Sequence, residues 1–130
     1  MKLELRHLAP YLPYGLKYFI DFEDGDTACW KVEGLTIQEI FIDGYDCNYD
    51  SKNCKPILRP LSDFEKVICK ELMIKFSTSL IIIHEIWALI QKDKTLNQIN
   101  YETYLFMCKN HVDFNNLIEE NLAIDINTIK

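Results

Sequence analysis

Glycine and proline are confined to one half of this chain, and that asymmetry limits its fold more than any other feature of the sequence. All four glycines and all four prolines lie within residues 1–60, and residues 61–130 contain neither. Glycine and proline punctuate strands and turns, whereas their absence permits long helices. At 130 residues the chain has the length of one ordinary domain. We therefore predict a single α+β domain, residues 1–130, in which a small antiparallel sheet from residues 1–60 packs against a C-terminal bundle of three to four helices.

Short strands and turns account for the first half. The pair Asp24-Gly25 stands between two apolar runs, a pattern that strongly favours a β-hairpin. Leu3 and Leu5 alternate with charged residues, which predicts a further strand at the start of the chain. The strands expected on these grounds cover residues 2–6, 16–22, 27–32 and 37–42, with residues 45–60 as a long ordered loop or a short edge strand.

The second half, residues 61–130, is mainly helical in its periodicity. Ser62 and Glu65 fit a capping box that would start the first helix, and Asp113 would cap a short last one. Between them we expect helices over residues 79–92 and from about residue 97 or 100 to residue 110. The strictly alternating residues 122–127 are a candidate final strand that returns to the sheet.

The helix that contains Trp87 is apolar nearly all round, which predicts that it is central and buried. A charge placed on such a helix would be buried without a partner, so Ile86→Asp is expected to unfold the chain. The side chains that we expect to be buried here and on the preceding helix are Leu72, Phe76, Ile83, Ile86, Leu89 and Ile90.

The charge balance excludes one large class of partner. The sequence has 14 Lys and Arg residues against 20 Asp and Glu residues, which gives a net charge of −6. A general nucleic-acid binder needs a basic surface, so we expect no direct sequence-specific contact with nucleic acid.

Neither a membrane span nor a secretion signal is expected. No apolar stretch approaches the roughly 20 residues of a membrane span, and the opening residues lack the apolar core of a signal peptide. The five cysteines are odd in number and include no C-x-x-C pair. We therefore expect reduced thiols in a cytoplasmic protein.

One pair of cysteines is a candidate for a zinc site, and it lacks a required feature. Cys47 and Cys54 could bind zinc together with His7 or His111. Structural zinc usually takes two close ligand pairs, whereas these cysteines are separated by six residues and have no partner pair. The sequence therefore predicts no metal and no other cofactor.

The sequence contains no catalytic signature. His84-Glu85 begins like an H-E-x-x-H zinc motif, but Ala88 replaces the second histidine, and His84 is expected to be a core or interface residue. Neither G-x-S-x-G nor a glycine-rich phosphate loop occurs. We therefore expect that the protein is not an enzyme. A small hydrolase remains a third hypothesis, in which a cysteine meets a histidine in the fold; the candidates are Cys29, Cys69 and Cys108.

Acidic residues gather at two predicted turns. Carboxylates crowded on a turn could hold a divalent cation, but their spacing is not that of a calcium loop, and turn formation already accounts for them. Tyrosines in the second group are candidate exposed anchors, since Tyr favours interface centres, although they could equally pack the loop. The partner-binding residues that we predict are Asp21, Glu23, Asp24 and Asp26 in the first group, and Asp43, Tyr45, Asp46, Tyr49 and Asp50 in the second.

Three stretches carry a family resemblance when they are taken in order. They are residues 8–17 (LAPYLPYGLK), 54–63 (CKPILRPLSD) and 122–128 (LAIDINT). With Asp113 and the apolar residues after it, they resemble a family of small phage and prophage proteins of Bacteroidota that has no established activity. Members often carry Gly where Asn121 stands here, and Asn is the next-best residue for a left-handed helix cap. The resemblance implies a mobile-element origin and a bacterial host cell, although the three stretches could define the fold alone.

These observations predict a non-enzymatic binding protein encoded by a phage or prophage. The function that we favour is inhibition of a host defence nuclease, of the anti-CRISPR type, by protein–protein contact. Its partner would be a host defence nuclease or ribonucleoprotein complex, and the negative charge would speed encounter with a basic channel. The alternative is a prophage housekeeping accessory protein in recombination or replication, whose partner would be a phage protein.

Overall fold

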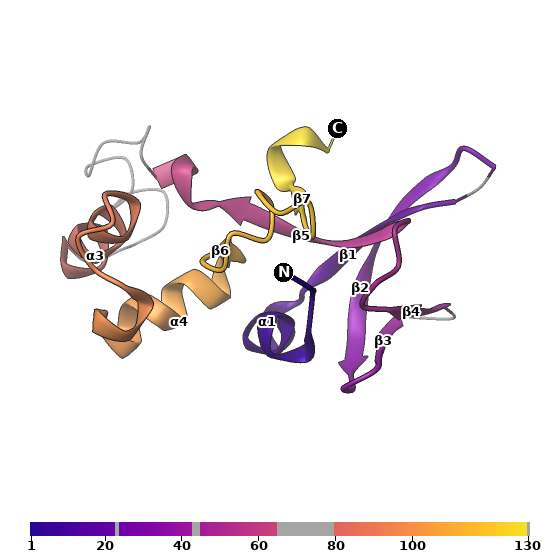
Figure 1. Ribbon diagram of the computed structural model, residues 1–130, viewed down its shortest axis with the longest axis horizontal. Coiled ribbons are helices and arrows are strands. Elements are labelled where there is room, and N and C mark those ends of the chain that lie inside the picture. Colours follow the sequence, from indigo (N-terminus) through magenta and orange to yellow (C-terminus); the bar gives the residue numbers. More distant parts are fainter. Residues whose placement is uncertain (23, 43–44, 65–79, 130) are drawn as a thin grey trace.

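The computed structural model describes residues 1–22, 24–42, 45–64 and 80–129 (Figure 1). The strands in this part of the chain are β1 (Lys17–Asp21), β2 (Thr27–Leu35), β3 (Glu39–Ile42), β4 (Tyr45–Asn48), β5 (Cys54–Pro60), β6 (Val112–Asp113) and β7 (Ile124–Asp125). The α-helices are α1 (Leu5–Leu8), α3 (Leu80–Ile90) and α4 (Tyr101–Lys109). Short 3₁₀ helices are η1 (Ala9–Tyr14), η2 (Leu61–Phe64), η3 (Leu96–Gln98) and η4 (Ile126–Thr128).

The strands form one mixed sheet in the order β4-β3-β2-β1-β5-β6, and β7 pairs with β5. The first four strands form an antiparallel meander, and β5 lies antiparallel to β1. In contrast, β6 and β7 pair in parallel with β5. The predicted N-terminal sheet packed on a C-terminal helix bundle is therefore wrong, because both halves of the chain supply strands and the helices are scattered along it.

The predicted hairpin around Asp24-Gly25 is confirmed. Lys17 pairs with Lys31 and Asp21 pairs with Thr27, which leaves the Asp-Gly pair at the tip. Alternation along the strand places Tyr18 and Ile20 on the core face, where both are fully buried. The stretch 45–60 supplies two strands, so the predicted long loop is wrong. The alternative of a short edge strand is confirmed by β4, whereas β5 lies inside the sheet between β1 and β6.

The first residues form a helix in place of the predicted strand. At the start of α1, the Glu4 backbone N–H donates to Nδ1 of His7 over 3.0 Å. The 3₁₀ helix η1 follows directly, and together the two elements bury Leu8 and Tyr11 completely in the main core. The alternation of Leu3 and Leu5 is too short a pattern to outweigh this capping contact and this burial.

The segment between β6 and β7 is also not helical. The short helix predicted after Asp113 is replaced by turns, in which Asn116 and Asn121 adopt left-handed backbone angles (φ 58° and 61°). The Asp113 carboxylate does cap this segment, since it accepts hydrogen bonds from three backbone N–H groups downstream. The turns direct residues 124–125 back to β5, so that the alternating tail returns to the sheet as the short strand β7.

Asp113→Ala is expected to lower the free energy of unfolding by about 3 kcal/mol, because it leaves the N–H groups of Asn115, Leu117 and Ile118 without their acceptor. Asp113 is 5% exposed, so water cannot replace the lost carboxylate freely. Asp113→Asn keeps one side-chain acceptor and should lose about half as much. Urea unfolding followed by circular dichroism measures the free energy of unfolding of both variants. Equal and small losses in the two variants would show that the Asp113 cap does not stabilise the tail.

Helix α3 lies at the edge of the molecule and not at its centre. Ile83 and Ile86 are buried against α4 and η2 in a second core cluster, whereas Ile81 and Trp87 are 59% and 47% exposed. The prediction of a central, wholly buried helix is therefore wrong. The physical reason is that α1, η1 and the tail already fill the core face of the sheet. Leu89 and Ile90 are partly buried on this cluster, while Leu72 and Phe76 lie outside the described residues.

A buried carboxylate joins α3 to α4. Glu85, only 6% exposed, accepts hydrogen bonds from the backbone N–H of Asn100 and from the hydroxyl of Thr103, at the start of α4. Lys94 lies 3.6 Å from one of its oxygens. Burial by itself raises the pKa of Glu85, but the hydrogen bonds from Thr103 and Asn100 and the charge of Lys94 together bring it below its ordinary value. The carboxylate thus fixes the N-terminus of α4 against α3.

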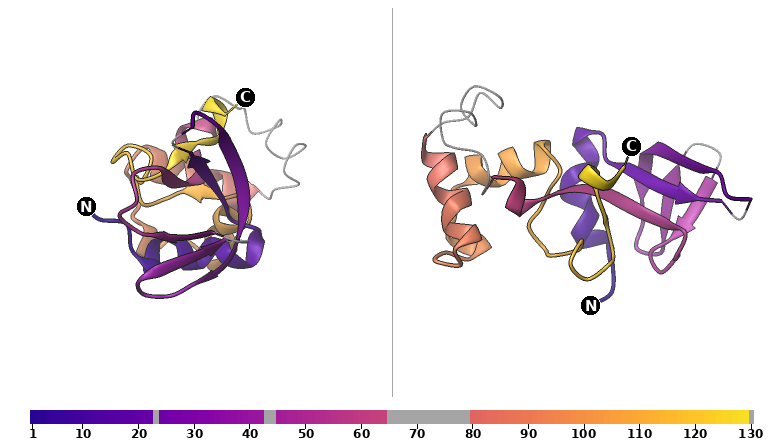
Figure 2. Two further views of the ribbon diagram at one scale, coloured as in Figure 1. Left: turned by 90° about the vertical axis from the view of Figure 1, so that its right-hand side faces the viewer. Right: turned by 90° about the horizontal axis from the view of Figure 1, so that it is seen from above.

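One end of the molecule is helical and the other is formed by a β-hairpin. In Figure 1 and in the right-hand view of Figure 2, α3 and α4 lie at one end, α1 lies in the middle, and the β1–β2 hairpin projects at the other end. None of the described helices has both the length and the apolar character to cross a membrane.

Candidate functional site

The tip of the β1–β2 hairpin owes its shape to the sequence Asp24-Gly25-Asp26. Gly25 has a φ of 92°, an angle that residues with a Cβ rarely adopt. Oδ1 of Asp24 accepts a hydrogen bond from the backbone N–H of Asp26 over 3.0 Å, as aspartates in turns commonly do. The Phe22 N–H closes the turn by donating to the carbonyl of Asp26 over 2.8 Å. The hairpin tip is therefore an ordered turn.

Three of the four predicted residues of the first acidic group are exposed on this hairpin. Asp21 lies at the end of β1, and Asp24 and Asp26 lie in the turn. None of the three carboxylates forms an ion pair with a cation in the described part of the chain. Glu23 lies outside the described residues. The hairpin thus projects unneutralised negative charge away from the body of the molecule (Figure 1).

An aromatic pair stands at the base of this acidic tip. Trp30 on β2 is 39% exposed and lies opposite Tyr18 in the hairpin register. Its ring contacts Phe22 edge-on, with ring centroids 5.7 Å apart and planes at 63°. No pattern in the sequence singles out Trp30. Its pairing with Tyr18 and its contact with Phe22 place it at the base of the hairpin tip.

The second predicted group is less uniform. Asp46 on β4 and Asp50 after it are exposed. Tyr49 is half-buried against the main core, and its hydroxyl donates to the Thr36 carbonyl, so this ring is held in the loop. The backbone of Tyr45 pairs with Ile42 at the start of β4. Asp43 lies outside the described residues.

The two acidic groups do not meet. Asp46 lies toward the end of β3 that points to the hairpin tip, whereas Asp50 follows the opposite end of β4, where Asn48 pairs with Glu39. β1 pairs with residues 27–31 of β2 and β3 pairs with residues 32–35, so the hairpin tip extends beyond the end of β3 at Ile42. At about 3.3 Å per residue, the five steps from Thr27 to Val32 amount to roughly 16 Å along β2. A partner that touched both groups would therefore need an extended surface.

The four candidate zinc ligands do not come together. The thiol of Cys54 lies within hydrogen-bonding reach of the Cys47 thiol, so this pair is brought together. In contrast, Nδ1 of His7 accepts from the Glu4 N–H, and Nε2 of His111 donates to the Tyr14 carbonyl over 2.7 Å. Within the described residues, no three His, Cys, Asp or Glu side chains are placed to hold a metal ion.

The remaining residues considered for chemistry are spread through the fold. His84 is exposed on α3, so the prediction of a core position is wrong, and an interface role for it stays a prediction. Cys29 is exposed on β2, and Cys108 is buried in α4, where Tyr104 is its hydrogen-bonding neighbour. Burial raises the pKa of the Cys108 thiol, which keeps it protonated. Cys69 lies outside the described residues.

The two partnered histidines predict acid sensitivity of the fold. Burial is the main cause that lowers the pKa of both His7 and His111 below the ordinary value near 6.5. As the pH falls, the histidines of the unfolded chain therefore take up protons before those of the folded chain. The neutral histidines contribute fully to the stability of the fold above about pH 6.5, and this contribution is lost as the pH falls below it. We expect the free energy of unfolding in urea to fall between about pH 7.5 and about pH 5.5.

Substitution of the same histidines tests this cause. The variant His7→Gln with His111→Asn should lose less stability over this pH interval than the wild type, and Asn suits the left-handed backbone of His111 (φ 55°). The exposed His84→Gln should change nothing. An equal loss in the double variant and the wild type would assign the acid sensitivity to other groups.

No protein-family model matches this chain, and neither the curated proteins nor the solved structures contain a similar one.

Proposed function

We propose that this protein is a non-enzymatic inhibitor of a host defence nuclease, encoded by a phage or prophage, and that it acts by protein–protein contact through its β1–β2 hairpin. The observation that carries the proposal is a cluster of three exposed carboxylates without ion-pair partners at the projecting tip, those of Asp21, Asp24 and Asp26. CRISPR effectors are one class of nuclease with the basic guide-RNA channel that such a tip would fit.

Charge favours this kind of partner. The net charge of −6 and the acidic tip would attract a surface rich in Lys and Arg and would speed the first encounter. The hairpin form of the tip matters as well, because an ordered turn loses little conformational freedom on binding. Nucleases that bind a nucleic-acid backbone expose such basic surfaces because Lys and Arg must neutralise the phosphate charges.

The aromatic pair adds a contact that charge alone cannot supply. Trp30 is partly exposed at the base of the hairpin tip and is supported edge-on by Phe22. A partner Arg could stack on the exposed indole face while its neighbours pair with Asp21 or Asp26. Trp and Arg are also the residue types that dominate the centres of protein interfaces. The hairpin therefore combines electrostatic steering with a short-range anchor.

Affinity capture from the native host tests the proposal. The bait is the tagged full chain, and two variants of equal charge serve as comparison. One carries Asp21→Lys, Asp24→Lys and Asp26→Lys. The matched control carries the same change at three acidic residues that are exposed elsewhere: Asp93, Glu119 and Glu120. Each set takes the net charge from −6 to zero.

The outcomes separate the candidate functions. Recovery of a nuclease or its ribonucleoprotein complex with the wild type and the control, but not with the hairpin variant, supports the proposal. Recovery of phage recombination or replication proteins would instead favour a prophage accessory role. A nuclease captured equally by all three baits would contradict the assignment of the hairpin as the contact.

A further inference from the structure

Two buried cysteines from different strands meet inside the sheet. Cys47 on β4 and Cys54, the first residue of β5, are 3% and 4% exposed, and their thiols are hydrogen-bonded neighbours. The turn between them brings them together. Within it the Asn48 N–H donates to Oγ of Ser51 over 3.2 Å, and the Ser51 N–H donates back to the Asn48 carbonyl over 3.2 Å.

A tyrosine hydroxyl without a partner faces this thiol pair. Tyr18 is fully buried, and its hydroxyl has no hydrogen-bond partner in the described part of the chain. Ile20, on the same face of β1 as Tyr18, pairs with Cys54, so the Tyr18 side chain lies on the side of the sheet that holds this thiol. Burial, followed by the neighbouring Cys47, Tyr49 and Cys54, raises the pKa of Tyr18, so its hydroxyl stays protonated and remains a donor. Buried donors are nearly always satisfied in proteins, so a donor without an acceptor calls for an explanation. An oxygen atom added to either sulfur would supply the missing acceptor.

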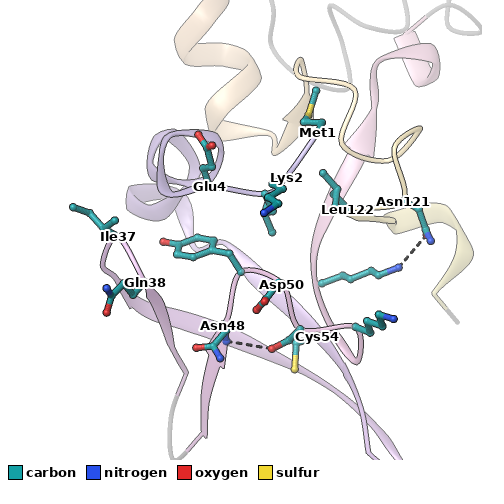
Figure 3. A pocket seen from close by; sticks show the side chains of 15 residues that line it. Met1, Lys2, Glu4, Ile37, Gln38, Asn48, Asp50, Cys54, Asn121 and Leu122 are labelled. Carbon is teal, nitrogen blue, oxygen red and sulfur yellow. Dashed lines mark hydrogen bonds between the residues drawn. The ribbon is translucent and has the colours of Figure 1, made fainter.

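One of the two thiols borders on a pocket. A cavity of about 810 Å³ lies between the N-terminal segment, the turn before β3 and the turn after β4 (Figure 3). Cys54 is among the residues that line it, whereas Cys47 is not. Of the two thiols, Cys54 is therefore the one that belongs to a residue bordering the pocket, where a small solute can enter.

We propose that Cys47 and Cys54 form a redox site at which a small hydroperoxide produces a reversible intramolecular disulfide. The inference concerns this thiol pair alone and does not depend on the proposed nuclease partner. The disulfide would tie β4 to the start of β5 and fix the turn that carries Asp50.

Each step balances with hydrogen peroxide as the oxidant. Cys54 loses its proton to solvent, and its thiolate attacks one peroxide oxygen. The O–O bond breaks, and the departing hydroxide takes up a proton to form water. Cys54 is then a sulfenic acid, and its new oxygen accepts the hydrogen bond of Tyr18. The Cys47 sulfur next attacks the Cys54 sulfur, so that the S–S bond forms, the S–O bond breaks, and a second water leaves with the Cys47 proton.

The order of the two thiols follows from their surroundings. Burial, together with the neighbouring Cys54, raises the pKa of Cys47 to about 12, so Cys47 stays a thiol until it resolves the intermediate. Cys54 borders on the pocket and is the thiol that peroxide reaches first. Cys29 and Cys108 stand apart, one exposed on β2 and the other buried in α4.

Peroxide titration of the folded full chain tests the proposal. The variant Cys29→Ser with Cys69→Ser leaves three thiols, of which Cys108 is the internal control. We expect peroxide to remove two thiols and to yield a Cys47–Cys54 cross-linked peptide by mass spectrometry, with Cys108 intact. Dithiothreitol should restore both thiols, and the unfolding temperature should be higher in the oxidised form.

Two further variants examine the intermediate. In Cys47→Ala the sulfenic acid cannot be resolved, so dimedone should label Cys54 and leave Cys108 unlabelled. Adding Tyr18→Phe should reduce that labelling, because the oxygen loses its hydrogen-bond donor. Three intact thiols in the peroxide-treated folded protein, or a cross-link that forms only in denaturant, would overturn the proposal. The titration of the unsubstituted pair is decisive even if Cys47→Ala does not fold.

Discussion

Replacing Asp21, Asp24 and Asp26 with lysine is expected to weaken binding to a basic nuclease surface by about 100-fold. Each reversal removes one attraction and adds one repulsion, and about 1 kcal/mol for each contact pair yields this factor when the three are combined. The loss should be largest at low salt, since the three carboxylates are exposed and salt screens them. Much of it should be a slower association rate, which titration by biolayer interferometry at two salt concentrations would measure.

The charge-matched control distinguishes local contact from overall charge. The variant with lysine at Asp93, Glu119 and Glu120 has the same net charge and leaves the hairpin intact, so it should bind nearly as well as the wild type. If both variants lost affinity equally, the net charge and not the hairpin would direct binding. Circular dichroism of both variants checks that the substitutions leave the fold unchanged.

Ile86→Asp is expected to cost about 4 kcal/mol or more in the free energy of unfolding, a large part of the stability of an ordinary domain. Ile86 is 1% exposed and packs in the cluster between α3 and α4, where a carboxylate would find no cation among the described neighbours. Urea unfolding followed by far-ultraviolet circular dichroism measures the loss.

The same substitution five residues earlier is the matched control. Ile81 lies on the same helix and is 59% exposed, so Ile81→Asp should change the free energy of unfolding by no more than about 0.5 kcal/mol. Equal losses in the two variants would mean that the exposed face of α3 is buried in solution. No loss in Ile86→Asp would show that α3 does not pack on α4 through this residue.

Local signals in the sequence predicted the elements that local contacts make. The Asp24-Gly25 pair and the apolar runs beside it predict the β1–β2 hairpin, because turn type and strand register lie within a dozen neighbouring residues. The helical pattern from Asn100 to Asn110 likewise predicts α4.

Long-range pairing is what the sequence pattern could not reveal. Nothing near Val112 indicates that it will lie beside Arg59, and the parallel pairing of β6 and β7 with β5 depends on contacts far apart in the chain. The uniform apolar character of α3 was misleading for the same reason. The burial of α3 depends on which elements cover the core face of the sheet, and α1 with η1 occupies that face.

The candidate site shows the same division. Turn chemistry predicted where Asp24 and Asp26 would lie, whereas the partly exposed Trp30 at the base of the hairpin tip became apparent only from the register of the hairpin and its contact with Phe22. The spacing of Cys47 and Cys54 does not fit a zinc site, and it does not indicate that their thiols lie side by side in the fold. The turn between them, closed by Asn48 and Ser51, brings the thiols together without any metal-binding pattern in the sequence.

A cleavage assay is the most direct test of how the protein acts. A guide-loaded nuclease that the protein captures is mixed with its target DNA while the purified full chain is added in increasing amounts. We predict that cleavage stops near one protein per nuclease complex, that the two co-elute, and that nuclease, guide and DNA keep their masses. Undiminished cleavage at a large excess of protein, or inhibition accompanied by a covalent change in the nuclease, guide or DNA, would contradict an inhibitor that works by contact alone.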